Sequence, residues 1–278
     1  MKKKVIVALL LCVITLTSVF AFAGCKPTEL VGFDIELAKL VAKDLGVDVK
    51  FQLISWSAKE TELSSRNIDL IWNGLTIDDG RLEQFCISSP YMNNKQIAII
   101  RKADKDKYTK DINSIKDAKF TYEEGSAGQD VAQDNGFVNK AGVNAQMDAL
   151  VEVKAGTSDI ALVDSVLGNF YCNADTSFSD LMVIPNLEFT VEQYGIAARK
   201  SDVGTIDKIN TSLAKLQANG ELKKLAEKYG LASELCDVSY ESKWDTLTDK
   251  EKEGWNYIVE KGNFVVGYTL YAPIAYED

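Results

Sequence analysis

The stretch 31–46 constrains the fold most strongly, because it has the start, the buried face and the end of an amphipathic helix. Asp34 is the predicted N-cap, and Glu36 adds negative charge to the first turn, where the helix dipole favours it. Apolar residues recur at spacings of three and four and so share one face: Ile35, Ala38, Val41, Ala42 and Leu45. Gly46 is the predicted C-cap, and the strict alternation of 47–53 predicts a half-buried strand directly afterwards.

The rest of the chain repeats this alternation of helices and strands. Helices are predicted at 59–66, at 206–216 and, after the break at Asn219-Gly220, at 222–229. Apolar runs predict strands at 68–76, 96–101, 119–122, 158–164, 181–185 and 194–199. Strands that alternate with helices predict an α/β fold with largely parallel sheets.

The composition excludes several classes of function. The 278 residues carry a net charge of −10 at pH 7, which argues against nucleic acids and anionic membrane surfaces as partners. Histidine is absent, which removes the commonest metal ligand and the commonest general base. We therefore expect no metal site, no cofactor and no catalytic residues.

The N-terminal residues 1–24 are predicted to be a secretory signal peptide rather than part of the fold. Three lysines at 2–4 precede a long apolar run, and the sequence around Cys25 resembles a lipobox, although Phe22 replaces the usual leucine. Cys25 would then carry a lipid. The alternative is an uncleaved membrane anchor. Either interpretation places the remaining chain outside the cytoplasm, anchored to the cell membrane.

Three cysteines remain after the signal region, Cys86, Cys172 and Cys236. An odd number allows at most one disulfide, and the spacing does not select a pair. Buried free thiols are the default expectation.

Beyond its periodicity, the segment Gly32-Phe33-Asp34-Ile35-Glu36-Leu37, with Val41, Ala42 and Leu45 following, resembles the bacterial extracellular solute-binding proteins of family 3. These are the polar amino-acid receptors of ABC importers. The resemblance implies a two-lobe periplasmic-binding-protein-like fold of type II, in which each lobe is a sheet flanked by helices. The hinge strands would be 96–101 and 194–199. Lobe 1 would comprise 26–96 and 197–278, and lobe 2 would comprise 97–196.

The C-terminal segment 261–278 resembles the first strand and loop of that family, which normally precede the helix at 31–46. We therefore predict a circular permutation, in which strand 264–271 returns to the sheet of lobe 1 through a helical segment at 244–261. Relocated termini are tolerated where they meet at a surface loop. The alternative is that the C-terminal strand pairs with another chain.

The resemblance also assigns ligand-binding residues. An amino acid carries a carboxylate and an ammonium that must both be paired when buried. Arg81 would grip the carboxylate with two parallel hydrogen bonds, and Asp164 would pair with the ammonium. From position alone, Arg81 could equally be a surface residue and Asp164 a helix cap. The other predicted contacts are Asn73, Gly74, Thr76, Ser126 and Ala127 for the main-chain groups, with Trp56 and Tyr271 as aromatic walls.

Tyr268 bears on the kind of amino acid. Many receptors for basic amino acids have an acid in the first strand, where this chain has Tyr268. The expectation is therefore a polar neutral ligand, such as glutamine or cystine.

The predicted function is a receptor that closes its two lobes on a polar amino acid and delivers it to the transmembrane subunits of an ABC importer. Related folds also include enzymes, such as cyclohexadienyl or prephenate-like dehydratases and lytic transglycosylases. An enzyme needs an additional acid or base in the cleft, and Glu124 is the nearest such residue in the sequence. A sensor domain would need a cytoplasmic output segment, which the sequence does not contain.

Overall fold

The computed structural model describes residues 29–173 and 176–278. The predicted signal peptide and the lipidation site at Cys25 lie outside these residues. Within the described part of the chain, none of the helices is both long and apolar enough to span a membrane.

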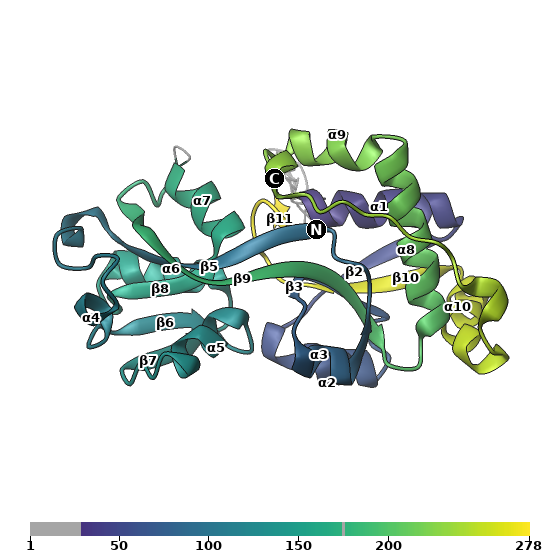
Figure 1. Ribbon diagram of the computed structural model, residues 1–278, viewed down its shortest axis with the longest axis horizontal. Coiled ribbons are helices and arrows are strands. Elements are labelled where there is room, and N and C mark those ends of the chain that lie inside the picture. Colours follow the sequence, from purple (N-terminus) through teal and green to yellow (C-terminus); the bar gives the residue numbers. More distant parts are fainter. Residues whose placement is uncertain (1–28, 174–175) are drawn as a thin grey trace, which may run out of the picture.

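Figure 1 shows two groups of elements joined by two long strands, β5 (Met92–Arg101) and β9 (Leu181–Arg199). Lobe 1 contains the strands β2 (Asp48–Leu53), β10 (Asn263–Tyr268) and β3 (Leu70–Thr76). Its helices are α1 (Phe33–Leu45), α2 (Lys59–Ser64), α3 (Asp79–Gln84), α8 (Val203–Ala218), α9 (Glu221–Lys228) and α10 (Asp249–Lys261).

Lobe 2 contains the strands β6 (Phe120–Glu123), β7 (Lys140–Val143) and β8 (Ile160–Asp164). Its helices are α4 (Ile112–Ile115), α5 (Ala127–Asp134), α6 (Gln146–Ala155) and α7 (Ser165–Asn173). Short 3₁₀ turns lie at Trp56–Ala58, Lys102–Asp104, Ala232–Glu234 and Trp244–Thr246, and the short strands are β1 (Leu30–Val31), β4 (Phe85–Ile87) and β11 (Tyr276–Glu277).

The strand ladder continues through both lobes in the order β2-β10-β3-β9-β5-β8-β6-β7, and β4 pairs with the end of β9. Pairing is parallel among β2, β10 and β3 and among β8, β6 and β7. It is antiparallel where β9 meets β3 and β5, and where β5 meets β8. The structure is therefore α/β, as predicted, with one mixed sheet shared between the lobes.

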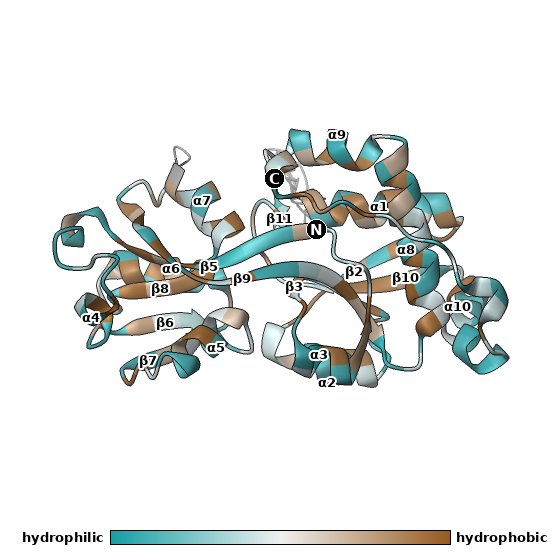
Figure 2. Ribbon diagram, in the orientation of Figure 1, coloured by the Kyte–Doolittle hydropathy of each residue, from teal (hydrophilic) through white to brown (hydrophobic). Residues whose placement is uncertain are grey.

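The two crossing strands differ in detail from the prediction. Strand β9 was expected as two strands, 181–185 and 194–199, but it is continuous, with shifts in its register on β5 between Ile97 and Ile99. The irregularity accommodates Pro185 and Asn186, whose φ is 58°. The residues that cross between the lobes pair as Met92–Lys95 with Val191–Tyr194, so the crossing on β5 precedes the predicted hinge at 96–101. Figure 2 shows that these central parts of both strands are polar.

The C-terminal strand β10 lies in the middle of the sheet of lobe 1, between β2 and β3 of the same chain. Phe264 pairs with Val49 on one side, and Val266 pairs with Leu70 on the other. The preceding helix α10 ends at Gly262, which adopts the left-handed conformation. In this structure the C-terminal segment returns to the sheet of its own chain, and the strand ends at Tyr268 rather than at 271.

The prediction that Asp34 is the N-cap of α1 is wrong. The cap position is Gly32, and the first N–H groups of the helix find their acceptors in the C-terminal segment. The N–H of Phe33 donates to the carbonyl of Pro273 at 2.9 Å, and that of Asp34 donates to the carbonyl of Ile274 at 3.0 Å. The Asp34 carboxylate is thereby released for another role. At the other end, Gly46 is the left-handed C-cap, as predicted.

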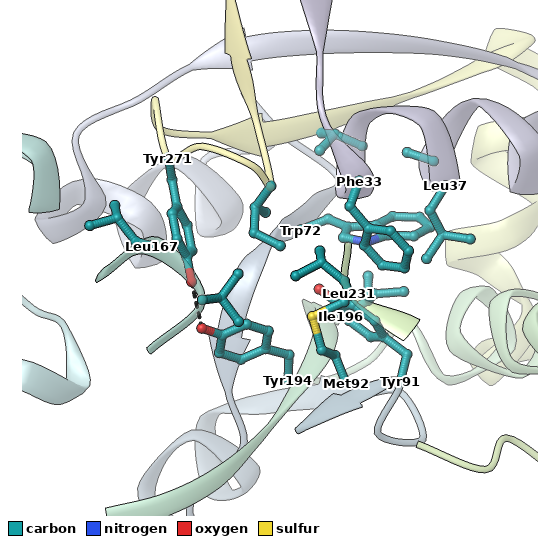
Figure 3. Close-up of a cluster of buried hydrophobic side chains, with 14 of the residues drawn as sticks. Phe33, Leu37, Trp72, Tyr91, Met92, Leu167, Tyr194, Ile196, Leu231 and Tyr271 are labelled. Carbon is teal, nitrogen blue, oxygen red and sulfur yellow. Dashed lines mark hydrogen bonds between the residues drawn. The ribbon is translucent and has the colours of Figure 1, made fainter. Parts of the chain in front are cut away.

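Helices cover both faces of the sheet in each lobe. The largest cluster of buried side chains extends from α1 and α8 in lobe 1 to α6 and α7 in lobe 2. Figure 3 shows its centre, where Phe33, Trp72, Tyr91 and Tyr194 pack together. Smaller clusters lie on the opposite faces, one in each lobe. The three cysteines of the described chain are free thiols, as expected.

Candidate ligand-binding site

All of the predicted ligand-binding residues line one cavity between the lobes. Lobe 1 supplies Trp56, Asn73, Gly74, Thr76, Arg81, Thr269 and Tyr271, and lobe 2 supplies Glu123, Ser126, Ala127, Gln146 and Asp164. The cavity is narrow. Its free volume is about 10 Å³, which is roughly the space of one water molecule.

Arg81 is fixed at the cavity by its own lobe. Its Nη1 donates to the carbonyl of Thr76 at 2.7 Å, and its Nε lies 3.2 Å from Asp78. Asp78 also caps α3, because its side chain accepts the Arg81 backbone N–H at 2.7 Å. A guanidinium has five N–H donors, so these contacts leave others for a carboxylate. Arg81 is therefore an oriented cation, only 9% exposed.

Asp164 ends the buried strand β8 and is held by side-chain amides. Its Oδ1 accepts hydrogen bonds from Asn94 at 2.7 Å and from Gln96, and its Oδ2 accepts one from Gln146. A carboxylate has about four acceptor positions, so Asp164 can still accept an ammonium. Asn94 and Gln96 also donate to Glu192 on β9. The pKa of Glu192 is raised to about 8, because burial and the nearby Asp164 charge both oppose its ionisation.

Ser126 and Ala127 lie where strand β6 passes into helix α5. Ser126 is the N-cap residue, with an extended backbone, and Ala127 is the first residue of the helix. N–H groups at this end have no acceptor within the helix, so an anion is favoured there. This end of α5 lies across the cavity from Arg81, on the other lobe.

The two predicted aromatic walls are both buried, on different parts of lobe 1. Trp56 belongs to a hydrophobic cluster under β3 as well as to the cavity. The Tyr271 hydroxyl lies 2.6 Å from that of Tyr194. Figure 3 marks this hydrogen bond with a dashed line. Gly74 of strand β3 adopts a φ of 63°, and a Cβ at this position would lie 2.9 Å from the Tyr271 ring. The side chain of Asn73 accepts hydrogen bonds from the backbone N–H and the hydroxyl of Thr269.

Asp34 holds the backbone of Gly74 in place without lining the cavity itself. Its Oδ2 accepts hydrogen bonds from the backbone N–H of Gly74 at 2.9 Å and from the Tyr91 hydroxyl at 2.8 Å. Complete burial raises the pKa of Asp34 to about 7, and these two donors oppose the rise. Asp34 thus holds the backbone of a predicted ligand contact, although it does not line the cavity.

Sequence reasoning missed Glu123, Gln146 and Thr269, and it named the wrong glutamate. Glu124 is exposed, whereas Glu123 is 3% exposed and lines the cavity. Strand β6 explains the difference, because Phe120 and Tyr122 face a hydrophobic cluster and Glu123 faces the other side. Successive side chains of a strand point to opposite faces, and this alternation could have indicated from the sequence that Glu123 faces away from Phe120 and Tyr122. Burial raises the pKa of Glu123 well above its ordinary value, and the Asp164 charge adds to the rise.

Lys59 connects the two lobes at the edge of the site. Its Nζ donates to the carbonyl of Trp56 at 3.3 Å in lobe 1 and to that of Gly125 at 3.0 Å in lobe 2. Burial and the nearby Arg81 charge lower the pKa of Lys59 to about 8. The Nη2 of Arg81 also reaches the Gly125 carbonyl, at 3.5 Å. One carbonyl of lobe 2 therefore accepts from two cations of lobe 1.

Comparisons with known proteins identify the family of this two-lobe structure. The sequence pattern of the bacterial extracellular solute-binding proteins, family 3, matches residues 13–232. The chain belongs to this family. A probable histidine-binding protein of Neisseria gonorrhoeae is 29% identical to this family 3 protein over 198 residues, which cover 70% of this chain and 72% of the relative.

Two solved structures are similar to this family 3 protein. An ABC uptake transporter substrate-binding protein from Streptococcus pneumoniae with bound histidine has a TM-score of 0.66 and 29% identity, over 76% of this chain and 85% of the other. The ancestral amino acid-binding protein AncCDT-1, a precursor of cyclohexadienyl dehydratase, has a TM-score of 0.65 and 29% identity, over 71% and 84%. The predicted family and the type II periplasmic-binding fold are thus confirmed. Transport is favoured over the dehydratase alternative.

Proposed function

We propose that this solute-binding protein is a receptor for a polar amino acid, which it delivers to the transmembrane subunits of an ABC importer. The observation that carries the proposal is the placement of Arg81 and Asp164 on opposite lobes of one enclosed cavity. These groups match the carboxylate and the ammonium of a free amino acid. The N-terminus of α5 supplements Arg81, and backbone carbonyls at Asn73 and Gly74 supplement Asp164.

Binding would require the lobes to move, because the cavity is too narrow for an amino acid to enter. The polar middle parts of β5 and β9 are the connections about which lobe 2 would swing. A ligand held by groups of both lobes stabilises the closed arrangement, since these contacts exist together only when the lobes meet. The importer would then recognise the closed form.

The proposal treats the protein as a binding protein and not as an enzyme. Glu123 is the cavity residue that could act as an acid, and the similarity to a dehydratase precursor makes this alternative worth testing. Recovery of an unchanged amino acid from the site supports the receptor. Conversion of a prephenate-like cyclic acid by the purified protein would support the enzyme.

Three predictions on the organisation of the chain are part of this proposal. The lobe boundaries are 26–96, 97–196 and 197–278. The order of the chain is circularly permuted, so that β10 occupies the place of the first strand of the family. Cys25 carries a lipid that anchors the protein outside the cytoplasm, after removal of residues 1–24. Incorporation of a labelled fatty acid that is abolished by Cys25→Ser tests the anchor.

The function is tested by thermal unfolding of the full-length protein, purified in mild detergent, with each of the twenty amino acids and cystine. A ligand that binds the native state raises the unfolding midpoint. We expect a rise with one or a few polar amino acids, confirmed by calorimetric titration. A folded protein whose midpoint responds to none of them would contradict the proposal.

A further inference from the structure

Glu123 is a buried carboxyl group for which the proposed function has no use. Its side chain lines the cavity and is 3% exposed, and its Oε1 has no hydrogen-bond partner within the described residues. A buried acceptor without a partner destabilises the folded state, and more so when it is charged. Such a group needs either a partner from outside the chain or a compensating role.

The other charged groups around the cavity already have partners. Arg81 contacts Thr76 and Asp78, and Lys59 donates to two carbonyl groups. Asp164 accepts three side-chain amides. None of the ion pairs within 4.0 Å in the described residues involves Glu123, although Lys59, Asp164 and Asp148 are close enough to affect its titration.

The proposed ligand would use Arg81 and Asp164 for its carboxylate and ammonium. Its side chain would then lie against other lining residues of the cavity, which include Glu123 and Trp56. An acidic side chain would oppose the ionisation of Glu123, as the Asp164 charge already does, and an aliphatic one would leave the carboxyl unpaired. A side chain with several N–H donors and a positive charge would satisfy Glu123 and lie against the Trp56 ring.

On the basis of the proposed function, we infer that Glu123 is the specificity-determining residue and that the ligand is a cationic amino acid whose side chain pairs with it. This reverses the expectation from Tyr268, which considered only the first strand. Tyr268 packs edge-on to Phe51 in a separate small cluster and does not line the cavity. The acid is supplied instead by β6 of lobe 2.

Calorimetric titration of the full-length protein tests the inference with matched ligands. Arginine, lysine, ornithine and histidine form the cationic set, and citrulline, glutamine and cystine form the neutral set. Citrulline is the most informative member, because it has nearly the shape of arginine without the charge. We expect the tightest ligand to be cationic and, where arginine binds, citrulline to bind about 100-fold more weakly.

The variant Glu123→Gln keeps the shape and removes the charge. It should weaken binding of the cationic ligand by about 100-fold, while changing citrulline binding by less than about threefold. Glu124→Gln is the matched control, since it makes the same change at the exposed neighbour and should leave every affinity unchanged. The unfolding midpoint without ligand reports whether each variant is folded.

Three results would overturn the inference. The first is a wild-type protein whose tightest ligand is neutral. The second is a Glu123→Gln variant that binds the cationic ligand as tightly as the wild type does. The third is a Glu123→Gln variant that loses the same factor in affinity for arginine and for citrulline. The first leaves the proposed receptor function intact, because an amino acid is still bound. A wild-type protein that binds none of these amino acids overturns the receptor function and the inference together.

Discussion

The guanidinium of Arg81 is oriented by Thr76 and Asp78 before it meets any ligand. Asp164 is oriented in the same way by three amides from β5 and α6. This pre-organisation matters because a side chain that is already fixed loses little conformational entropy on binding. It also keeps each buried charge hydrogen-bonded when the two lobes have moved apart.

Replacing Arg81 with lysine should weaken amino-acid binding by about 100-fold or more. Lysine retains the charge but cannot make two parallel hydrogen bonds to a carboxylate, and its ammonium would not span the contacts to Thr76 and Asp78. Calorimetric titration measures the loss. Arg66→Lys changes an exposed arginine and should have no effect. If Arg81→Lys binds the amino acid as tightly as Arg66→Lys does, Arg81 does not hold the ligand.

Replacing Tyr91 with phenylalanine should change how stability depends on pH. The pKa of Asp34 is about 7 in the folded protein, against an ordinary value of 3.8, so the folded state binds the proton more tightly than the unfolded state. The free energy of unfolding therefore falls as the pH rises from about 4 to 7. Without the Tyr91 hydroxyl, which lowers this pKa, the fall should continue above pH 7.

Urea unfolding at several pH values measures this effect. Tyr91→Phe should lose about 1 kcal/mol at pH 5, where Asp34 is protonated, and about 2 kcal/mol or more at pH 8.5, where it is charged. Tyr257→Phe, at a partly exposed tyrosine outside this network, is the control. A loss that is the same at both pH values would show that the hydroxyl does not interact with the Asp34 charge.

At the scale of elements, the end of strand β3 shapes the wall of the cavity. Gly74 is in the left-handed conformation there, its N–H is held by Asp34, and the Tyr271 ring leaves no space for a Cβ. Strand β3 is buried throughout, between β10 and β9. The backbone of β3 therefore cannot shift to relieve a collision without disturbing both neighbours.

Gly74→Ala should destabilise the protein by about 1–3 kcal/mol more than Gly136→Ala. Both glycines have similar positive φ values, 63° and 66°, so both variants suffer the same conformational cost. A Cβ at Gly136 meets nothing within 4 Å, whereas at Gly74 it meets Tyr271 and Tyr194. Thermal unfolding of the two variants measures their difference in stability, which reports the collision of the new Cβ with the tyrosine rings. Similar losses of stability would mean that the tyrosine rings move aside freely.

At the scale of the whole molecule, the contacts of Lys59 and Arg81 with the Gly125 carbonyl join the lobes independently of the ligand. If the lobes move apart as proposed, these contacts are lost. They therefore affect the balance between open and closed forms, and through it the affinity for any amino acid.

Lys59→Met should lower the affinity for every bound amino acid by the same factor, about 10-fold, because it removes a charged hydrogen bond of the closed form. Small-angle scattering should show a larger radius of gyration without ligand. Lys50→Met, at an exposed lysine of β2, is the control. A loss restricted to one amino acid would instead mean that Lys59 contacts the ligand side chain.

Periodicity and caps such as Gly46 specify the helix–strand unit at 31–53, and the alternation of such units specifies the α/β class. Arg81 and Asp164 were predicted as ligand contacts through the family resemblance, which rests on a motif whose residues are close together in the chain. The return of β10 to the sheet was predicted from the resemblance of 261–278 to the first strand of the family and from the helical segment that precedes it.

The roles of the buried acids depend on contacts that form only in the folded chain. Asp34 looks like an N-cap in the sequence, but the carbonyls of Pro273 and Ile274 cap the helix and Asp34 holds Gly74 instead. Glu123 and Glu124 are neighbours in the sequence, and the packing of β6 places Glu123 at the cavity and leaves Glu124 exposed. The physical reason is that a buried polar group takes its partners from distant segments, which local patterns do not specify.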